Sequence, residues 1–422
     1  AAHDAGLAGI MMAMGVSARA ASHEVMKAGP EKRSAALLAM AARIRAAAPA
    51  LLEANRHDMA AATAKGISGA MLDRLELTPA RIEAMAQGVE DVAGLPDPVG
   101  SVMATWTRPN GLEMSRVRGP IGVIGIIYES RPNVTADAGA LCLRAANAAI
   151  LRGGSESLKS SRAIADCLRA GLADVGLPQD AIQLVQTADR AAVGHILSGL
   201  GGKLDVVVPR GGKSLVARVQ EEARVPVIGH LEGLCHTYIH AKADPDKAEA
   251  IILNAKLRRV GVCGSTETMM IDASIAPTLL PRLAKALEAK GCELRGDERA
   301  RAIYPMTAAT EEDWTTEYLA PILSIAVVDT IDAAMAHIAR YGSQHTDSIV
   351  TEDKSTAERF LAEVDSAIVM HNTSTQFADG GEFGFGGEIG IATGRLHARG
   401  PVGAEQLTIF KYVVRGTGQI RP

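Results

Sequence analysis

Residues 122–156, GVIGIIYESRPNVTADAGALCLRAANAAILRGGSE, decide the fold of this chain. A run of glycine and β-branched residues comes first, an alanine- and leucine-rich segment follows a polar turn, and a second apolar run ends in two glycines. This order predicts a buried strand, a helix and a second buried strand. Strands that alternate with helices in this way build the parallel sheet of a doubly wound α/β domain.

The same alternation continues towards the C-terminus in two series of short apolar runs, separated by segments of about one helix length. The first series continues at 182–186, 204–212 and 225–230, and the second comprises 235–241, 267–272, 292–296, 322–329, 346–352 and 366–372. We therefore predict two α/β domains, over residues 1–228 and 229–395, followed by a C-terminal return over residues 396–422.

Towards the N-terminus, residues 17–92 carry apolar side chains at helical spacing and are predicted to be helical. Thr78 followed by Pro79 is a typical helix start, and the proline-rich segment 95–100 is a stop. The apolar residues 1–15 lack the basic region of a signal peptide, and we expect them to form a loose amphipathic segment.

A hairpin is predicted over residues 101–118, because the pair Asn110–Gly111 is a strong hairpin signal. A further strand is expected over residues 405–417, after both series have ended. A lone terminal strand needs a partner, which is either this hairpin or another subunit.

Charge and cysteine content argue against several classes of protein. A net charge of −4 without a basic face argues against nucleic-acid binding, and no run approaches the roughly 18 apolar residues of a membrane-spanning helix. The five cysteines are odd in number and widely spaced, which argues against a disulfide framework or a thiolate zinc site. Such cysteine usage is typical of the reducing cytoplasm.

The first series is expected to bind a phosphate-bearing dinucleotide at the carboxyl ends of its strands. Helix N-termini there offer free N–H groups to anions, glycine lets the backbone approach a phosphate, and arginine adds charge-assisted hydrogen bonds. Two strands end in such residues, namely Arg152, Gly153, Gly154 and Ser155, and Arg210, Gly211, Gly212, Lys213 and Ser214. Neither stretch matches a standard dinucleotide or P-loop motif, so an ordinary tight turn is the alternative for each one alone.

RRVGVCGSTET, residues 258–268, presents a single cysteine between glycines in the second series. Cys263 is either a reactive nucleophile or a small buried thiol that fills a gap. Arg258 and Arg259 would favour the thiolate or bind an anionic substrate. Gly261 and Gly264 would let a substrate carbonyl reach the sulfur.

Asn133 lies in a polar turn between a predicted buried strand and a helix. Its side-chain amide is a suitable oxyanion donor, because it offers an N–H group without charge. The alternative is that Asn133 simply caps the helix that follows.

GHLEGLCHTYIH, residues 229–240, is rich in side chains that can bind a metal. Cys235 and His236 are adjacent on a predicted strand, so they would point to opposite faces and could not share one ion. We therefore expect no metal site from this segment, since dedicated sites show regular ligand spacing.

These motifs, in this order, resemble those of the γ-glutamyl phosphate reductases (glutamate-5-semialdehyde dehydrogenases), a family of the aldehyde dehydrogenase superfamily. The resemblance extends from about residue 17 to the C-terminus and is most specific in residues 122–156, in VVVPRGGKSL (206–215), in NAKLRRVGVCGSTET (254–268) and in GPVGAEQLTIFKYVVRGTGQIR (400–421). Three residues depart from the family pattern, because Ala146, Val260 and Gly264 stand where glycine, proline and asparagine are usual.

The resemblance implies roles for individual residues. Cys263 corresponds to the catalytic thiol, and Asn133 corresponds to the side-chain half of an oxyanion hole that the backbone N–H of Cys263 completes. Arg152 corresponds to a lysine near the adenosine ribose, and Glu317 resembles the glutamate that holds the nicotinamide ribose. The hairpin and the terminal strand resemble the flap that pairs across a dimer.

The implied activity is the NADPH-dependent reduction of L-γ-glutamyl 5-phosphate to L-glutamate 5-semialdehyde and phosphate through a cysteine thioester, the second step of proline biosynthesis from glutamate. Residues 1–228 would then bind the dinucleotide, and residues 229–395 would form the catalytic domain. A homo-oligomer, either a dimer or a dimer of dimers, is expected, with glutamate 5-kinase as a candidate partner. Arg258, Arg259 and Arg395, with Arg399, are candidates for substrate contact.

Two other functions remain open. Hydrolytic NAD(P)-dependent aldehyde dehydrogenases carry an E-L-G-G-K segment whose glutamate activates water, whereas this chain has HLEGLCH, with Glu232 outside that pattern. A catalytically silent nucleotide-binding or scaffold protein on the same fold would bind the dinucleotide and leave Cys263 unreactive.

Overall fold

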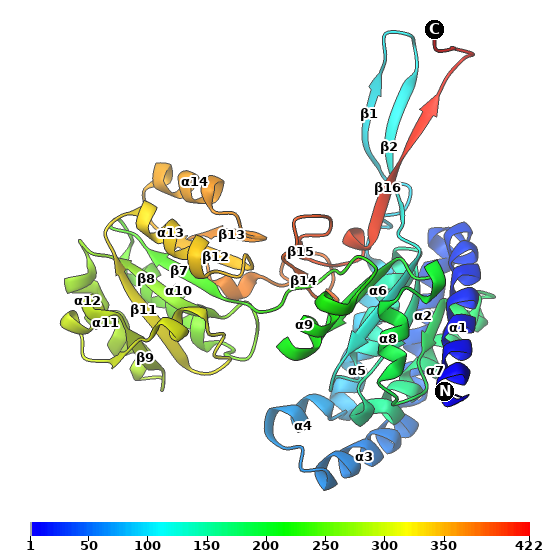
Figure 1. Cartoon of the computed structure of the whole chain (residues 1–422), viewed down its shortest axis with the longest axis horizontal. Coiled ribbons are helices and arrows are strands. Elements are labelled where there is room, and N and C mark those ends of the chain that lie inside the picture. The colour runs from blue at the N-terminus through cyan, green and yellow to red at the C-terminus, as the bar shows by residue number, and fades with distance from the viewer. Residues whose placement is uncertain (1) are drawn as a thin grey trace. The chain divides into compact units, whose positions relative to one another are not determined.

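The structure of the chain is a computed structural model that describes residues 2–422, and it divides into two compact units (Figure 1). One unit comprises the chain up to Gly229 with Gly384–Gly390 and Pro401–Pro422, and the other comprises His230–Phe383 and Ile391–Gly400. Each unit holds a parallel sheet covered by helices, which confirms the predicted α/β fold class.

The sheet of the first unit has four parallel strands in the order β5–β4–β3–β6. Successive strands are added on one side of β3 and then on the other, so the strand order reverses between β3 and β6. The elements of this unit are α1 (Ala2–Lys27), α2 (Gly29–Ala46), α3 (Ala48–Ala64), α4 (Gly69–Leu75), α5 (Pro79–Gly94), β1 (Val102–Thr107), β2 (Glu113–Pro120), β3 (Val123–Tyr128), α6 (Val134–Arg144), β4 (Ala148–Arg152), α7 (Leu158–Asp174), β5 (Ile182–Leu184), α8 (Ala191–Leu197), β6 (Val206–Arg210), α9 (Lys213–Glu222) and β16 (Thr408–Arg415).

The N-terminal segment differs from its prediction, because it forms one long helix, α1, rather than a loose segment. Leu7, Met11 and Ala18 are buried in one cluster with Val123 and Ile150 of the sheet. Burying such side chains contributes roughly 1.5–3 kcal/mol for each large one, which fixes the helix on the sheet. The predicted start of α5 is confirmed, since the Thr78 side chain accepts a hydrogen bond from the N–H of Arg81.

The strand predicted over residues 225–230 is not formed. This segment makes only an isolated bridge between Val227 and Val207. The N–H of Val207 donates to the carbonyl of Pro226, and its own carbonyl accepts from Ile228. Because proline has no N–H group, the pairing cannot continue, and the sheet ends at β6.

Ala146 adopts a left-handed backbone conformation, with φ of 60°. It lies in the turn between α6 and β4, where its departure from glycine was noted. An L-residue in this conformation costs about 1–2 kcal/mol, which explains why glycine is the usual choice there.

The hairpin prediction is confirmed, and the terminal strand pairs with it. β1 and β2 are antiparallel, and β16 pairs with β2 from Thr408–Pro120 to Arg415–Glu113. Figure 1 shows the three strands side by side as a ribbon that extends away from the helices of its unit. We call this three-stranded sheet the flap.

The second unit has a seven-stranded sheet in the order β10–β9–β11–β8–β7–β12–β13. Its elements are β7 (Cys235–Ile239), α10 (Pro245–Leu257), β8 (Thr266–Asp272), α11 (Ala276–Glu288), β9 (Glu293–Gly296), α12 (Glu298–Ile303), β10 (Thr307–Ala308), β11 (Ile322–Val328), α13 (Ile331–Tyr341), β12 (Thr346–Val350), α14 (Lys354–Glu363) and β13 (Ile368–His371), and the short strands β14 (Ile391–Ala392) and β15 (Gly400–Pro401) follow.

Strand β8 shows why the second sheet is covered on both faces. Met269 and Ile271 pack into one buried cluster with Leu280 of α11, whereas Met270 packs into another with Phe360 of α14. Successive side chains of a strand point to opposite faces, so an uninterrupted apolar strand needs helices on each side.

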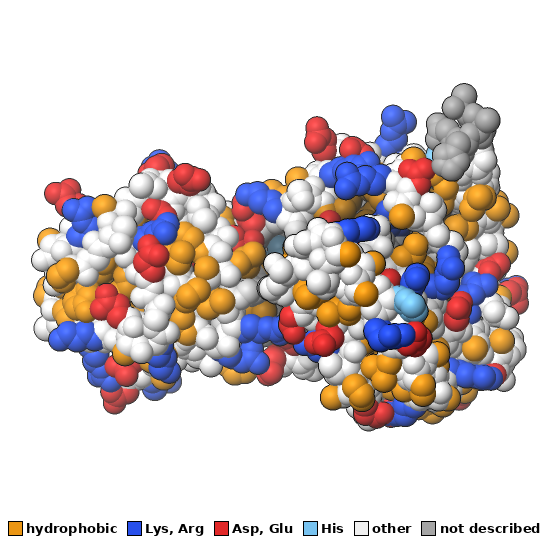
Figure 2. Space-filling view, turned by 90° about the horizontal axis from the view of Figure 1, so that it is seen from below, with side chains coloured by type: hydrophobic (Ala, Val, Ile, Leu, Met, Phe, Trp, Pro, Cys, Tyr) orange, Lys and Arg blue, Asp and Glu red, His pale blue; other side chains and the backbone are white. Residues whose placement is uncertain are grey.

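Among the described residues, no single helix has both the length and the apolar character of a membrane span. The pair α2 and α3 meets that standard only when the two are joined across their 68° bend. On the face shown in Figure 2, positive and negative side chains are interspersed on each unit.

Candidate active site

Cys263 lies in a tight turn at the amino end of β8. The N–H of Ser265 donates to the carbonyl of Val262 at 3.0 Å, which closes the turn around Cys263 and Gly264. A Cβ atom on Gly233 would lie 2.1 Å from the carbonyl oxygen of Cys263, so only glycine fits there. A Cβ on Gly264 would lie 3.1 Å from the carbonyl oxygen of Thr375. Close backbone packing on two sides therefore fixes the position of the Cys263 main chain.

Two histidines face the sulfur of Cys263. One ligand atom from each of His230, Cys263 and His345 lies within 4.8 Å of the other two, and the two imidazole rings meet edge to face with centroids 4.8 Å apart. Burial raises the pKa of the Cys263 thiol, but the charge of His345 and a hydrogen bond from His230 outweigh it and hold this pKa well below its ordinary value. Cys263 is therefore set up as a thiolate, the nucleophilic form.

The other four cysteines have thiols whose pKa is raised instead of lowered. Burial raises the pKa of Cys142 to about 12 and those of Cys167 and Cys292 to about 11. Cys235 is fully buried, and burial raises its pKa well above the ordinary value. Its Sγ–H donates to the carbonyl of Cys263 at 3.1 Å, a contact that only the protonated thiol can make. Cys263 alone among the five combines partial exposure with a lowered pKa.

Glu317 is attached to the backbone beside Cys263. Its Oε1 accepts a hydrogen bond from the N–H of Gly233 at 3.0 Å, and Gly233 is the glycine that abuts Cys263. Burial raises the pKa of Glu317, and the charge of Cys263 raises it further.

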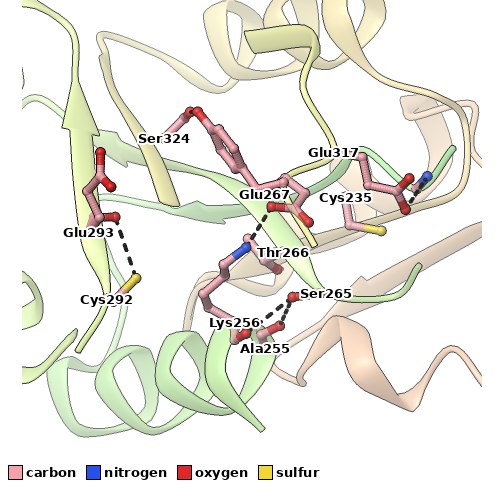
Figure 3. A network of polar contacts seen from close by, with 12 residues as sticks. Cys235, Ala255, Lys256, Ser265, Thr266, Glu267, Cys292, Glu293, Glu317 and Ser324 are labelled. Carbon is pink, nitrogen blue, oxygen red and sulfur yellow. Dashed lines mark hydrogen bonds and ion pairs between the residues drawn. The ribbon is translucent and has the colours of Figure 1, made fainter. Parts of the chain in front are cut away.

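A buried ion pair joins Lys256 to Glu267, close in the chain to the Cys263 turn (Figure 3). Lys256 of α10 and Glu267 of β8 are 0% and 1% exposed, and their Nζ and Oε2 atoms are 2.6 Å apart. Burial raises the pKa of Glu267 to about 7, although Lys256 opposes the shift. Ser265 also donates to the carbonyl of Lys256 at 3.2 Å. The pair therefore joins the end of α10 to the start of β8 on either side of the turn.

Arg258 lines a pocket of 270 Å³ at the carboxyl end of α10. The pocket also carries the polar side chains of Asn254, Asn372, Ser374 and Glu382. Arg258 is exposed, and its guanidinium lies 3.5 Å from the amide oxygen of Gln376. It thus offers a positive charge to a ligand in this pocket.

The other predicted arginines are placed differently. Arg259 is exposed, and its carbonyl accepts a hydrogen bond from Gln376. Arg395 and Arg399 each form an ion pair with Asp365, at 2.5 and 2.8 Å. Both guanidinium groups therefore already have a carboxylate partner.

In the first unit, the predicted phosphate-binding residues lie at the carboxyl ends of β4 and β6. Arg152 is only 8% exposed, its guanidinium donates to the carbonyls of Gly153 and Ala188, and its Nε is buried without a partner. A Cβ on Gly153 would meet the Tyr128 ring at 3.2 Å, and a Cβ on Gly154 would meet the Glu156 carboxylate at 2.1 Å. The Tyr128 ring and the Glu156 carboxylate therefore pack closely against these glycines, and Ser155 begins a short 3₁₀ turn after them.

The segment after β6 begins helix α9 and faces the end of β3. The N–H of Glu129 donates to the carbonyl of Arg210, and the N–H of Gly212 donates to the Glu129 carboxylate at 3.0 Å. A Cβ on Gly211 would lie 2.6 Å from the same carboxylate. Ser214 lies in the exposed first turn of α9. The two strand ends thus meet where the strand order reverses, which is where open α/β sheets bind ligands.

Asn133 occupies the N-cap position of α6, but its side chain makes no capping hydrogen bond. Its Nδ2 instead donates to Asp137 at 3.0 Å. Burial raises the pKa of Asp137 to about 6, while Asn133 and Arg210 oppose the shift. One amide hydrogen of Asn133 is thereby fixed in direction, and the other is left for a further acceptor.

The residues of the segment 229–240 separate as the strand geometry predicts. The side chain of Cys235 faces the Cys263 turn. The Nδ1 of His236 instead lies 2.8 Å from the Oδ1 of Asp347, and the Nδ1 of His240 lies 2.8 Å from the hydroxyl oxygen of Thr351. His345, which the sequence interpretation did not name, is the group that joins Cys263 and His230. Glu156, which accepts hydrogen bonds from the N–H and hydroxyl of Ser130, was also missed. Neither residue lies in a motif or at a regular spacing from the residues it contacts.

Comparison with known proteins agrees with this architecture. The profile of the aldehyde dehydrogenase family matches residues 8–303 and 303–413. The chain is 66% identical to the γ-glutamyl phosphate reductase of Rhodospirillum rubrum over 415 residues, covering 98% of this chain and 97% of that protein. It is 67% identical to the γ-glutamyl phosphate reductase of Hyphomonas neptunium, covering 99% and 98% of the two chains.

A solved structure shows the same relationship in three dimensions. The crystal structure of γ-glutamyl phosphate reductase from Thermotoga maritima superposes with a TM-score of 0.95 at 41% identity, covering 98% of this chain and all of that one. The chain therefore belongs to the aldehyde dehydrogenase family and, within it, to the γ-glutamyl phosphate reductases.

Proposed function

We propose that this chain reduces L-γ-glutamyl 5-phosphate to L-glutamate 5-semialdehyde and phosphate, with NADPH as the reductant, in the second step of proline biosynthesis from glutamate. The observation that carries the proposal is Cys263, a partly exposed thiol whose pKa two histidines hold low. The names of the relatives supply the substrate.

The reaction begins at the sulfur of Cys263. The thiolate attacks the γ-carbonyl carbon of the acyl phosphate, phosphate leaves with the bonding electron pair, and a thioester remains. Phosphate is a stable anion and needs little help to depart, so the step depends mainly on the thiolate. The contact between His230, His345 and Cys263 provides that thiolate.

The residues of the first unit fit a nicotinamide dinucleotide. The orphaned Nε of Arg152 and the glycines Gly153, Gly154 and Gly211 lie at the carboxyl ends of the strands. Arg152, Arg210 and the first turn of α9 would hold the phosphate groups, and Glu317 would hold the nicotinamide ribose. When bound, the cofactor supplies a hydride to the thioester carbonyl carbon. The choice of NADPH over NADH is part of the proposal.

Asn133 and the backbone N–H of Cys263 would hold the oxyanion that forms at the former carbonyl oxygen. The side chain of Asn133 is already oriented by Asp137, so little reorganisation is required when the charge develops. Collapse of this tetrahedral species releases the semialdehyde and returns the thiolate of Cys263.

The pocket beside Arg258 has charges that complement an amino acid. The Arg258 guanidinium suits a carboxylate or phosphate, and the Glu382 carboxylate suits an ammonium group. We therefore keep Arg258 as a substrate-binding residue, with Arg259 beside it. Arg395 is a weaker candidate, because substrate would have to displace Asp365 from it.

Hydrolysis of the thioester requires a base that activates water, and the carboxylate next to the turn is poorly suited to that role. Glu267 has a pKa of about 7, which suits a general base. It is, however, 1% exposed and paired with the fully buried Lys256, so water does not reach it. This burial excludes Glu267 as the water-activating base, and the phosphate dependence of the reaction decides between the reductase and the hydrolytic alternative.

The test runs the reaction backwards, because the forward substrate is unstable. The protein is mixed with glutamate-5-semialdehyde and NADP, and the absorbance of NADPH is followed with and without phosphate. We expect NADP reduction only when phosphate is present. Reduction without phosphate would show that water attacks the thioester, and no reduction by folded protein would favour the silent scaffold.

We also propose that the flap joins copies of this chain into a dimer or a dimer of dimers. Phe410, Tyr412 and Val414 alternate along β16 and are 42–58% exposed, and Trp106 packs edge to face on Tyr412. An exposed apolar row of this kind is typical of an interface. Sedimentation analysis should show an oligomer, and Tyr412→Lys should shift it towards the monomer.

Because all five cysteines are free thiols, we place the enzyme in the cytoplasm, where a glutamate 5-kinase would supply the acyl phosphate.

A further inference from the structure

We propose that His230, Cys263 and His345 form a binding site for a soft divalent cation, with Zn²⁺ as the preferred ion, and that the bound ion holds the enzyme in a reversible resting state. The binding site stands on geometry alone, whereas its effect on turnover rests on the proposed role of Cys263 as the nucleophile. The three side chains come from one unit and offer two nitrogens and one sulfur within 4.8 Å of one another.

The donor set matches what Zn²⁺ selects. Thiolate and imidazole are its usual ligands, with Zn–S of about 2.3 Å and Zn–N of about 2.0–2.1 Å, so ligand atoms on a tetrahedral ion lie roughly 3.3–3.6 Å apart. The cluster therefore has to contract by at most about 1.5 Å, which rotations of the Cys263 side chain and of the two imidazole rings would supply. Three protein ligands leave the fourth position to water.

The histidines are already oriented as metal ligands are. The Nδ1 of His230 lies 2.6 Å from the carbonyl oxygen of Ile391, so this nitrogen carries the proton, and the ion would replace the hydrogen bond between His230 and Cys263. The Nδ1 of His345 lies 2.8 Å from the Thr346 hydroxyl. A metal-bound histidine almost always makes such a contact through its other ring nitrogen, and the contact fixes the tautomer.

An independent observation points to a missing ligand. His345 is 0% exposed, and its Nε2 has no hydrogen-bond partner. A buried polar atom without a partner costs about 1–3 kcal/mol, so its persistence beside a thiol and a second imidazole calls for a ligand. A cation bound to this nitrogen would remove that cost.

The local charge also suits a divalent ion. The thiolate of Cys263 supplies one negative charge, and the carboxylate of Glu317 is fixed to Gly233, which abuts Cys263. The ion would form coordinate bonds to sulfur and to two neutral imidazoles, and it would displace any protons that these groups hold. The sulfur lone pair that attacks the acyl phosphate would then be occupied, so turnover would stop until a chelator removed the ion.

The first experiment measures binding without any catalytic assay. Full-length protein is freed of metal with EDTA and dialysed against Zn²⁺ alone, and bound zinc is determined by elemental analysis. We expect one tightly bound zinc per chain in the wild type. Its affinity should fall by about 100-fold or more in His345→Ala and in His230→Ala, because loss of even an outer partner costs about 10–100-fold.

His57→Ala is the matched control, since His57 is an exposed histidine on α3 that contacts Glu53. It should bind zinc as the wild type does. Equal affinity in wild type, His230→Ala and His345→Ala would overturn the proposal. Wild-type protein alkylated at Cys263 with iodoacetamide provides a test that does not depend on the folding of a variant, and retention of the same tight site there would also overturn it.

A second measurement identifies the sulfur as a ligand. At a free Zn²⁺ concentration 100 times the dissociation constant, only about one chain in 100 keeps a free site, so iodoacetamide labelling of Cys263 should slow by about 100-fold. Substitution with Co²⁺ should give the near-ultraviolet band of a cobalt–thiolate bond. Tight binding with neither labelling protection nor this band would place the ion elsewhere and end the proposal.

Activity is measured separately, in the reverse reaction. If zinc binds as expected and a chelator restores turnover, both proposals stand. If zinc binds and protects Cys263 but the zinc-free protein shows no phosphate-dependent reduction, the proposed function fails and the binding site remains. If turnover is normal and zinc neither binds nor inhibits, only the further inference fails.

Discussion

Cys235 and Cys263 are in direct contact, yet their thiols are in opposite states. The Sγ of Cys235 lies 3.1 Å from the carbonyl oxygen of Cys263. Burial raises the pKa of Cys235 well above its ordinary value, whereas the charge of His345 and a hydrogen bond from His230 more than offset the burial of Cys263 and lower its pKa. Reactivity is therefore set by the few groups that face each sulfur.

The backbone explains why only one sulfur meets the histidines. Cys235 begins the regular strand β7, and its buried side chain is surrounded by the sheet. Cys263 lies in the turn closed by Ser265, outside any strand, so its sulfur emerges towards His230 and His345. A turn residue at a strand end can present its side chain in a direction that a strand residue cannot.

The largest expected effect comes from deleting each sulfur in turn. Cys263→Ala should fold normally and lose all reduction, because no other group can form the thioester. Cys235→Ala should keep most of its activity, since Cys235 is a buried thiol with no nucleophilic character. Steady-state rates in the reverse reaction, with circular dichroism as the folding control, give the answer. Near-normal turnover in Cys263→Ala would contradict the assignment of Cys263, and not Cys235, as the reactive thiol.

Sequence patterns were sufficient for most of the fold and for the choice of Cys263 as a candidate. Strand and helix alternation follows from local hydrophobic periodicity, so β3, β4, β6 and β8 were all predicted. The 225–230 strand failed because Pro226 has no N–H group with which to extend the pairing with β6 beyond the single bridge at Val227, which local apolarity does not reveal. Residues 1–15 were expected to be loose because the burial of Leu7 and Met11 depends on a sheet formed much later in the chain.

The environment of the thiol could not be predicted in the same way. His345 precedes β12 and Cys263 precedes β8, and the two meet because only β7 lies between these strands in the sheet. No spacing in the sequence encodes that strand order. Arg395 was proposed as a substrate residue without any sign that Asp365 would pair with it. Long-range contacts of this kind depend on sheet order, which periodicity leaves undetermined.

The next largest effect is expected from breaking the buried ion pair of Lys256 and Glu267. This change tests whether water is excluded from the region that also holds the buried thiol of Cys235. Lys256→Met leaves Glu267 buried and unpaired, which should destabilise the fold by about 3–5 kcal/mol. The double variant Lys256→Met with Glu267→Leu should recover most of that loss, because no uncompensated charge remains. Thermal unfolding of the three proteins measures the difference. If Lys256→Met is as stable as the wild type, water reaches Glu267, and the strong burial assigned to this region is wrong.

Asn133→Ala separates formation of the thiolate from the chemistry that follows it. The variant should lose about 10²–10³ in kcat, the usual cost of one oxyanion donor. The iodoacetamide labelling of Cys263 should stay unchanged, because the histidines that lower its pKa belong to the other unit. Unchanged kcat would restrict Asn133 to its contact with Asp137, and slower labelling would mean that Asn133 acts on the thiol itself.

The smallest effect is the most direct test of why the two cysteines differ. Labelling of Cys263 follows the thiolate fraction, so in the wild type it should remain fast at pH values well below the roughly 8.5 of an ordinary thiol. His345→Ala removes the charge that lowers this pKa, and burial then raises it, so the labelling profile should move to higher pH by at least about one unit. One unit corresponds to about 1.4 kcal/mol and to a tenfold slower reaction at a fixed pH on the rising limb. Peptide mapping should find Cys235 unlabelled in both proteins. An unshifted profile in folded His345→Ala would leave His230 as the group that activates the thiol, and the same measurement on His230→Ala would then decide how the two imidazoles share that role.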